Sequence, residues 1–202
     1  MNPYKEPNVR GYVRAFLDAY FADNRPRVLV FGINPGRFGA GITGVTFTDP
    51  VALADTCGVA NALPRRRELS SIFIYAFIAR WGGVRPFYRR FFLTAVSPLG
   101  FTRQNTNLNY YDMPALARRV MPFIASTMAR QIALGGRADH AIVLGRGANL
   151  RFVEALNERH GFFRVIHALE HPRWIMQYRR RHLARYLAKY DAVFARAEGR
   201  LD

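Results

Sequence analysis

The sequence predicts a single α/β domain, a three-layer α/β/α sandwich with a central four-stranded parallel sheet. Two observations lead to this fold class. Four short apolar segments alternate with stretches of helical periodicity, and each apolar segment ends at a turn that contains Gly or Pro. The chain of 202 residues is 50% hydrophobic and 14% aromatic, which is enough for one packed core. Without a repeat or a linker in the sequence, residues 1–202 are expected to form one domain.

The four predicted strands are short, apolar and separated by long connections. They cover residues 28–31, 88–96, 140–144 and 162–168. The first stops at the Gly/Pro-rich turn 32–36, and the second stops at Ser97-Pro98, because Pro cannot continue a central strand. In parallel sheets the loops that follow the strands meet at one edge, where ligands bind. We therefore look for a functional site among the loops after these strands.

Helical periodicity marks the connections between the strands. The predicted helices cover 9–21, a short segment within 49–62, the stretch from Pro64 to Trp81, 114–134, 149–159 and a long basic helix over 175–196. Asp49 is a suitable N-cap, with Pro50 in the first helical position. The run Arg65–Arg67 stands at the start of the third helix, where a solvated charge run is the simpler interpretation and a phosphate contact is the alternative.

Composition limits the function classes. The net charge is +16 and the pI is near 11.1, so the surface attracts polyanions, nucleic acid first and acidic membranes or proteins next. The single cysteine, Cys57, and the absence of a metal-type histidine pair predict neither a disulfide nor a metal site, and we expect no cofactor. No apolar run is long enough to cross a bilayer. A soluble, cytoplasmic, monomeric protein is expected.

Polar side chains are predicted to converge at the edge where the strands end. They are Asn34, Ser97, Asn105, Asn107, Asn109, Tyr110, Tyr111 and His171. They include no carboxylate pair, no nucleophile elbow and no P-loop lysine, so phosphoryl transfer and ordinary acyl hydrolysis are poorly supported. Amides and a histidine suit the edge of a planar polar ring, and aromatic residues such as Phe38 and Phe47 suit its face. Together with the charge, this indicates a pocket for a nucleobase from DNA.

Two motifs resemble those of a known enzyme family. The segment 32–47, GINPGRFGAGITGVTF, is similar to the first motif of the single-strand-selective uracil-DNA glycosylases, family 3 of the uracil-DNA glycosylase superfamily. That motif reads G-M-N-P-G followed by F-G and T-G-V-P-F. His171-Pro172 resembles the family's second motif, which leads into a loop that penetrates DNA. The chain most resembles the bacterial, second single-strand-selective branch, from about residue 26 to 190.

The resemblance implies a role for each matching residue. Asn34 would orient the hydrolytic water, and His171 would stabilise the departing base anion as a neutral donor. Substrate contacts would come from Gly32, Ile33, Pro35, Gly36, Phe38 and Phe47, with Phe47 stacking on the flipped base. Arg173 or Trp174 would wedge into the duplex, while Gln177, Arg179 and Arg180 would contact phosphates.

One position departs from the family pattern. Animal-type enzymes read H-N-L-C-P-L in the second-strand motif, whereas this chain has Ala95 where the base-recognising Asn would stand. Ser97 or backbone groups would then supply the lost contacts, and Asn107 and Asn109 are further candidates, with turn capping as their alternative role. Hypoxanthine or xanthine becomes a credible substrate beside uracil. We expect a monofunctional DNA glycosylase of base excision repair acting on deaminated bases. The alternative is a DNA-binding protein that kept the fold and lost the chemistry.

Overall fold

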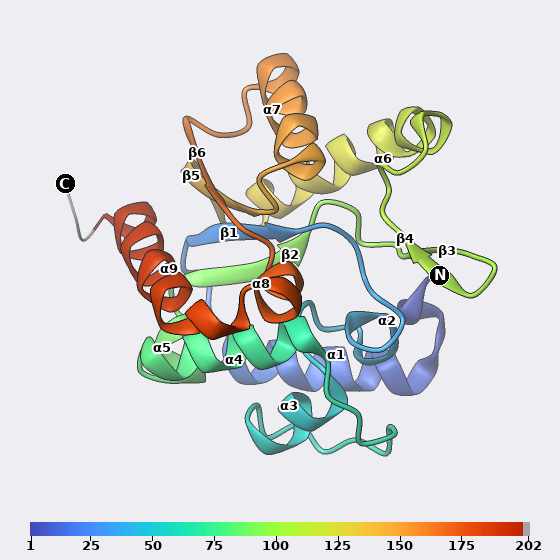
Figure 1. Ribbon diagram of the computed structural model, residues 1–202, viewed down its shortest axis with the longest axis vertical. Helices are drawn as coiled ribbons and strands as arrows, with labels where there is room; N and C mark the ends of the chain where they lie inside the picture. Colours follow the sequence, from blue (N-terminus) through green and yellow to red (C-terminus); the bar gives the residue numbers. More distant parts are fainter. Residues whose placement is uncertain (200–202) are drawn as a thin grey trace.

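The sheet predicted from the sequence is present. The computed structural model describes residues 1–199. Within them, four parallel strands lie in the order β2 (Phe91–Ala95), β1 (Arg27–Gly32), β5 (Gly136–Leu144) and β6 (Val165–Leu169) (Figure 1). The pairing of β1 with β2 runs from Val28 beside Phe91 to Gly32 beside Ala95. The last residues of these two strands are therefore direct neighbours.

Alternation along β1 explains the three layers. Val28 and Val30 face one apolar cluster, while Leu29 and Phe31 face the other, and all four are buried. The first layer contains α1 (Pro7–Tyr20), α3 (Pro50–Asp55), α4 (Leu69–Arg80), α5 (Val84–Tyr88), α8 (Pro172–Tyr178) and α9 (Leu183–Glu198). The second contains α6 (Pro114–Ala133) and α7 (Ala148–His160). The predicted α/β/α sandwich is confirmed.

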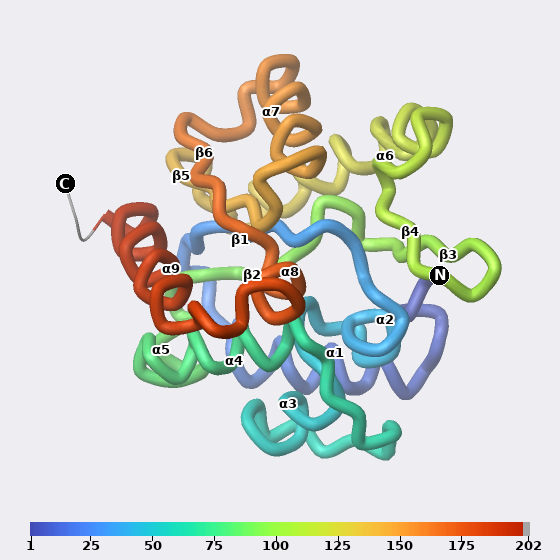
Figure 2. The backbone as a smooth tube through the Cα atoms, in the orientation of Figure 1, coloured from blue at the N-terminus to red at the C-terminus, as the bar shows by residue number. Residues whose placement is uncertain are grey.

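The predicted long basic helix over 175–196 is wrong. The chain instead forms α8, a 3-10 turn over Arg180–His182 and α9, and the backbone bends between the two helices (Figure 2). Arg179 leaves helical geometry at φ −133° and ψ 19°. The reason is packing: α8 lies against α4, whereas α9 packs along β5 and β6, and one straight helix cannot follow both directions.

Other boundaries differ from the sequence expectation for local reasons. The second strand begins at Phe91, because Tyr88 closes α5 with its side chain buried. The helix expected from Pro64 begins at Leu69, where the Glu68 carboxylate accepts the amides of Ser70 and Ser71. Arg65–Arg67 therefore precede the helix. The short helix α3 begins as expected, with Asp49 accepting from the Ala52 amide.

Besides α5 and the 3-10 turn Arg180–His182, three further short elements were not predicted. They are the 3-10 turn Pro3–Lys5, α2 (Ala40–Thr43) and a hairpin formed by β3 (Phe101–Arg103) and β4 (Thr106–Leu108). The turn of the hairpin uses Gln104 and Asn105 at positive φ, 47° and 59°, a conformation that Asn tolerates better than most residues. None of the helices in residues 1–199 is long and apolar enough to cross a membrane.

Candidate active site

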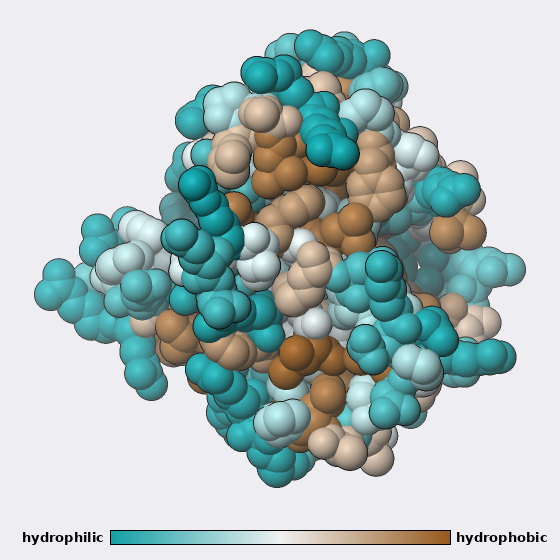
Figure 3. All heavy atoms as spheres, turned by 90° about the vertical axis from the view of Figure 1, so that its right-hand side faces the viewer, coloured by the Kyte–Doolittle hydropathy of each residue, from teal (hydrophilic) through white to brown (hydrophobic). Residues whose placement is uncertain are grey.

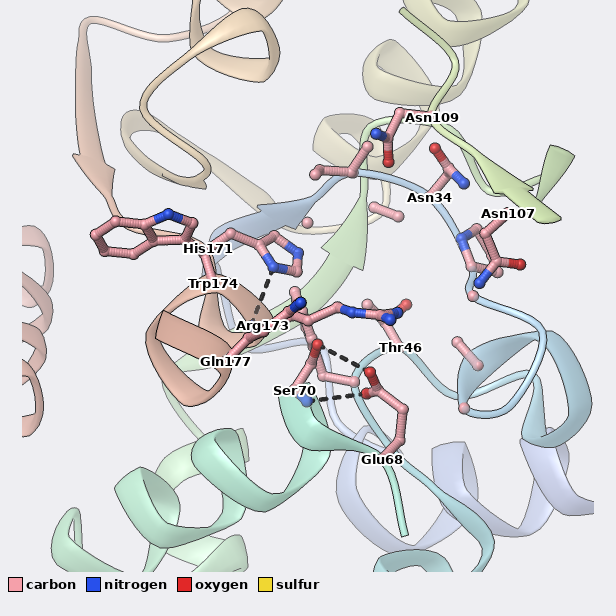
Figure 4. A pocket seen from close by; sticks show the side chains of 18 of the residues that line it. Asn34, Thr46, Glu68, Ser70, Asn107, Asn109, His171, Arg173, Trp174 and Gln177 are labelled. Atoms are coloured by element: carbon pink, nitrogen blue, oxygen red, sulfur yellow. Dashed lines mark hydrogen bonds between the residues drawn. The ribbon is translucent and has the colours of Figure 1, made fainter. Parts of the chain in front are cut away.

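A cavity of about 360 Å³ opens where the strands end. Figure 3 views this face, on which hydrophilic side chains flank a band of more apolar ones. The end of β1 and the chain that follows it line the cavity with residues 32–36, 39–40 and 46–47. The other lining residues come from later segments and are Glu68, Ser70, Ala95, Asn107, Asn109, Tyr111, His171, Arg173, Trp174, Gln177 and Tyr178 (Figure 4). Segments far apart in the sequence thus form one site.

Asn34 is fixed in the wall of this cavity. Its Nδ2 donates to the Leu108 carbonyl at 3.1 Å, and its Oδ1 accepts from the Tyr110 amide at 3.1 Å. A carbonyl only accepts and an amide N–H only donates, so these contacts define which end of the side chain is oxygen. One N–H and one lone pair remain for a water molecule. Such an amide orients water but is a poor base.

His171 presents a hydrogen-bond donor to the same cavity. Its Nδ1 caps α8 by accepting the Arg173 amide at 3.2 Å. Burial, and secondarily the positive charge of Arg173, lowers the pKa of His171 to about 4. The ring is therefore neutral at pH 7, and since Nδ1 accepts, its proton is on Nε2. The ring points into the cavity from the end of β6 (Figure 4).

Phe47 forms the floor beside His171. The two ring centroids lie 5.7 Å apart. Phe47 has φ 57°, an unusual conformation for a bulky residue. The flanking turn holds it there, with the Thr43 hydroxyl donating to the Thr48 carbonyl at 2.7 Å. The ring also lies on Gly32, where an added Cβ would come within 2.6 Å of it, so a side chain at that glycine would displace the ring.

Ala95 lines the cavity at the end of β2, beside Gly32. Two residues that we assigned to substrate contact lie outside the lining. Ser97 is fully buried and its hydroxyl serves its own turn, donating to the Leu99 carbonyl at 2.9 Å. The Phe38 ring is held between the guanidinium groups of Arg37 and Arg66, at 4.6 and 3.7 Å. The structure thus gives Ser97 no open contact with a base in this cavity.

The other converging polar residues divide into two groups. Asn107, Asn109 and Tyr111 line the cavity, whereas Asn105 and Tyr110 do not. The Asn105 carbonyl accepts from the Arg37 guanidinium at the tip of the hairpin. Tyr110 is fully buried behind Asn34.

Sequence reasoning missed four lining residues with polar groups, namely Thr46, Glu68, Ser70 and Tyr178. The sequence Glu-Leu-Ser-Ser before an apolar helix indicates a cap, which is what Glu68 provides. That signal identifies a helix start. It contains no information on which strand ends the helix faces, so the position of Glu68 across from His171 follows only from the tertiary structure.

The predicted DNA contacts lie at the mouth of the cavity. Arg173, Trp174 and Gln177 line it, and Trp174 is 38% exposed. Arg179 and Arg180 are exposed outside the lining, in the bend between α8 and α9, with the Arg179 guanidinium 5.0 Å from the Trp174 ring. The bend thus places Arg179 beside Trp174, one of the lining residues.

Comparison with known proteins identifies the family. The model of the uracil DNA glycosylase superfamily matches residues 19–195. The chain belongs to this superfamily. The crystal structure of wild-type Pedobacter heparinus SMUG2 superposes with a TM-score of 0.92 and 42% sequence identity, over 96% of this chain and 86% of that chain. No curated protein matches.

The match confirms the resemblance read from the two motifs, and the chain is a SMUG2-like member of the uracil DNA glycosylase superfamily. Both motifs fall within the matched residues. The superfamily implies a DNA substrate, which agrees with the net charge of +16.

Proposed function

We propose that this protein is a monofunctional DNA glycosylase that hydrolyses the N-glycosidic bond of uracil and of other deaminated bases, such as hypoxanthine and xanthine, in DNA. The main observation is that Asn34 and His171 line one cavity together with Phe47, whose ring lies 5.7 Å from that of His171. These residues supply a place for water, a donor for the leaving group and a surface for the base. The base must leave the duplex to enter such a cavity.

Asn34 and His171 divide the chemistry. A water held by the free N–H and lone pair of Asn34 attacks C1′ of the deoxyribose as the N-glycosidic bond breaks. The electron pair of that bond leaves with the base, and the proton of the water passes to solvent or to the departing base. The Nε2–H of His171 donates to a base carbonyl, on which negative charge accumulates. Fixed dipoles of this kind lower the barrier without a strong general base.

Ala95 favours a broad choice of base. A side-chain amide at this position would read one pyrimidine edge, whereas a methyl group reads none. The neighbouring Gly32 adds no side chain, and Ser97 has its hydroxyl engaged by Leu99. We infer that backbone groups and shape select the base, which admits deaminated purines as well as uracil.

The reaction ends at the abasic site in this proposal. A lyase step needs an amine nucleophile near C1′. Lys189 is on α9 and donates to both carboxylate oxygens of Glu170, at 2.8 and 3.0 Å. Lys5 is exposed in the N-terminal turn. Neither lysine lines the cavity.

Excision from a panel of bases tests the proposal. Oligonucleotides with one uracil, hypoxanthine or xanthine, single- and double-stranded, are incubated with excess protein and then treated with alkali to cleave abasic sites. We expect scission at deaminated bases only and strong loss of it in Asn34→Ala, with DNA affinity retained. DNA binding without scission on any base would instead establish the alternative, an inactive DNA-binding protein.

A further inference from the structure

The orientation of Asn34 depends on a distant segment of the chain. Both hydrogen bonds to its amide come from the backbone of residues 108–110, which begin at the last residue of β4 and continue beyond the β3–β4 hairpin. This segment contains neither helix nor strand after Leu108. A turn shapes it locally, in which the Asp112 amide donates to the Asn109 carbonyl at 3.1 Å and Asp112 Oδ2 accepts from the Asn109 amide at 2.7 Å. A contact outside this turn must tie the segment to the core for Asn34 to be held.

Tyr110 fixes the segment. Its side chain is fully buried, with the ring 5.0 Å from Tyr111 and 4.7 Å from Phe152, both edge-on. Its hydroxyl donates to Oδ1 of Asn149 at 2.8 Å. Burial raises the pKa of Tyr110, so the hydroxyl keeps its proton and remains a donor. The packing of the ring fixes how deeply Tyr110 is buried, and the hydrogen bond of its hydroxyl fixes the direction in which the side chain points.

Asn149 connects this contact to the sheet. It is 1% exposed, in the first turn of α7, and its Nδ2 donates to the carbonyl of Leu144, the last residue of β5, at 3.2 Å. A buried polar chain thus runs from the end of β5 through Asn149 and Tyr110 to Asn34. Both buried side chains in this chain, Tyr110 and Asn149, have hydrogen-bond partners, which is the condition under which a buried polar network rigidifies a site.

We propose that Tyr110 and Asn149 are positioning residues for Asn34, which hold its amide at the angle required to orient the hydrolytic water. The inference rests on the proposed function, since it assigns a purpose to the angle of Asn34. Neither residue touches the cavity. Removing the Tyr110 hydroxyl leaves the ring packed but frees the 108–110 segment to shift, and a shift of about 1 Å in a reacting group costs about 100-fold in rate.

The experiment compares variants that remove this hydrogen bond from either side. Single-turnover excision of uracil is measured for Tyr110→Phe and Asn149→Ala, with DNA affinity and thermal unfolding measured beside it. Tyr88→Phe is the matched control, because Tyr88 is 1% exposed and its hydroxyl lies 3.4 Å from that of Tyr75, away from the cavity lining. Each change is also made in the Asn34→Ala background.

We expect Tyr110→Phe and Asn149→Ala to slow excision by about tenfold or more with unchanged DNA affinity, because a loosened amide holds water less well. In the Asn34→Ala background the same changes should leave the residual rate unaltered, as expected for residues that act through Asn34. Tyr88→Phe should lose stability yet keep its rate. If Tyr110→Phe does not fold, Asn149→Ala carries the test.

Two results overturn the inference while the proposed function stands. In the first, the wild type excises uracil and Asn34→Ala is slow, but Tyr110→Phe and Asn149→Ala excise uracil at the same rate as the control Tyr88→Phe. The other is an equal slowing in the presence and absence of Asn34, which would make Tyr110 a residue of general stability. A wild type that excises no base overturns the proposed function and this inference together.

Discussion

Replacing Gly32 with Ala would displace the Phe47 ring, which forms the floor of the cavity. The new Cβ would lie 2.6 Å from Cζ and 2.8 Å from Cε2 of Phe47. Gly32 is the last residue of β1 and is not among the residues at positive φ, so its backbone accepts Ala. The change therefore acts through the Phe47 ring.

The structure gives the size of the displacement. Ordinary van der Waals contact begins at 3.4 Å, so the ring must move by about 0.8 Å. The Thr43–Thr48 hydrogen bond restrains its backbone and His171 stands beside it, which leaves the cavity as the open direction. A displacement near 1 Å costs about 100-fold, so we expect single-turnover excision of uracil to fall by about 10- to 100-fold. Overpacking of this kind costs about 1–3 kcal/mol in free energy of unfolding.

Gly11→Ala is the matched control. Gly11 is in α1, and no atom lies within 4 Å of a Cβ added there. This variant should excise uracil at the wild-type rate and unfold at a slightly higher temperature, because Ala is the better helix former. A Gly32→Ala variant that is folded and as fast as Gly11→Ala would refute the role of Phe47 as the surface that receives the base.

Four further predictions concern His171 and the DNA contacts. With the pKa of His171 lowered to about 4, single-turnover rates should show no inflection near pH 6.5, and an inflection there that disappears in His171→Ala would contradict the neutral donor. The same shift predicts that the free energy of unfolding falls as pH drops from 6.5 towards 4, where only the unfolded chain binds the proton, and that His171→Ala reduces this loss. Trp174→Ala should slow excision from duplex DNA more than from single strands, since a wedge matters only where a base must be flipped; equal slowing would remove Trp174 from that role. Arg179→Ala and Arg180→Ala should weaken binding alike for damaged and undamaged DNA and flatten its salt dependence, whereas Arg130→Ala on α6, exposed outside the cavity lining, should change binding less.

The sequence predicted the sheet and the location of the site because both follow from local patterns. The unbroken apolar run from Val28 to Phe31 indicates a strand buried on both faces, and parallel strands bring their carboxyl ends together. His171 and Asn34 are 137 positions apart, yet each follows a predicted strand. Their convergence needed only the order of elements. The break between α8 and α9 was missed because the basic sequence there has helical periodicity, and tertiary packing on two different neighbours overrides it.

The surroundings of the site could not be predicted in the same way. Glu68 lines the cavity although the sequence did not predict it, and Ser97 does not line the cavity although the sequence predicted that it would. Glu68 has the sequence signature of a helix cap and lines the cavity, whereas Ser97 follows a strand and turns away to bond Leu99. In each case the outcome depends on the rotation of one side chain about a loop backbone, which periodicity does not encode. Tyr110 is a third example, since its polar neighbours on the chain gave no sign that its ring is buried.

The two halves of the proposed reaction are attached to opposite layers of the fold. Phe47 belongs to the apolar cluster that includes α4 and α8, and His171 caps α8. Asn34 is held by Tyr110, which belongs to the cluster of α6 and α7. The end of β1 is the element that both share, because Gly32 supports the ring and Asn34 follows two residues later. Substitutions in the first layer should therefore change how the base is bound and released. Substitutions in the second layer should change how the water is oriented. Because the end of β1 connects the two layers, the distance between the water and the base depends on the geometry of residues 32–34.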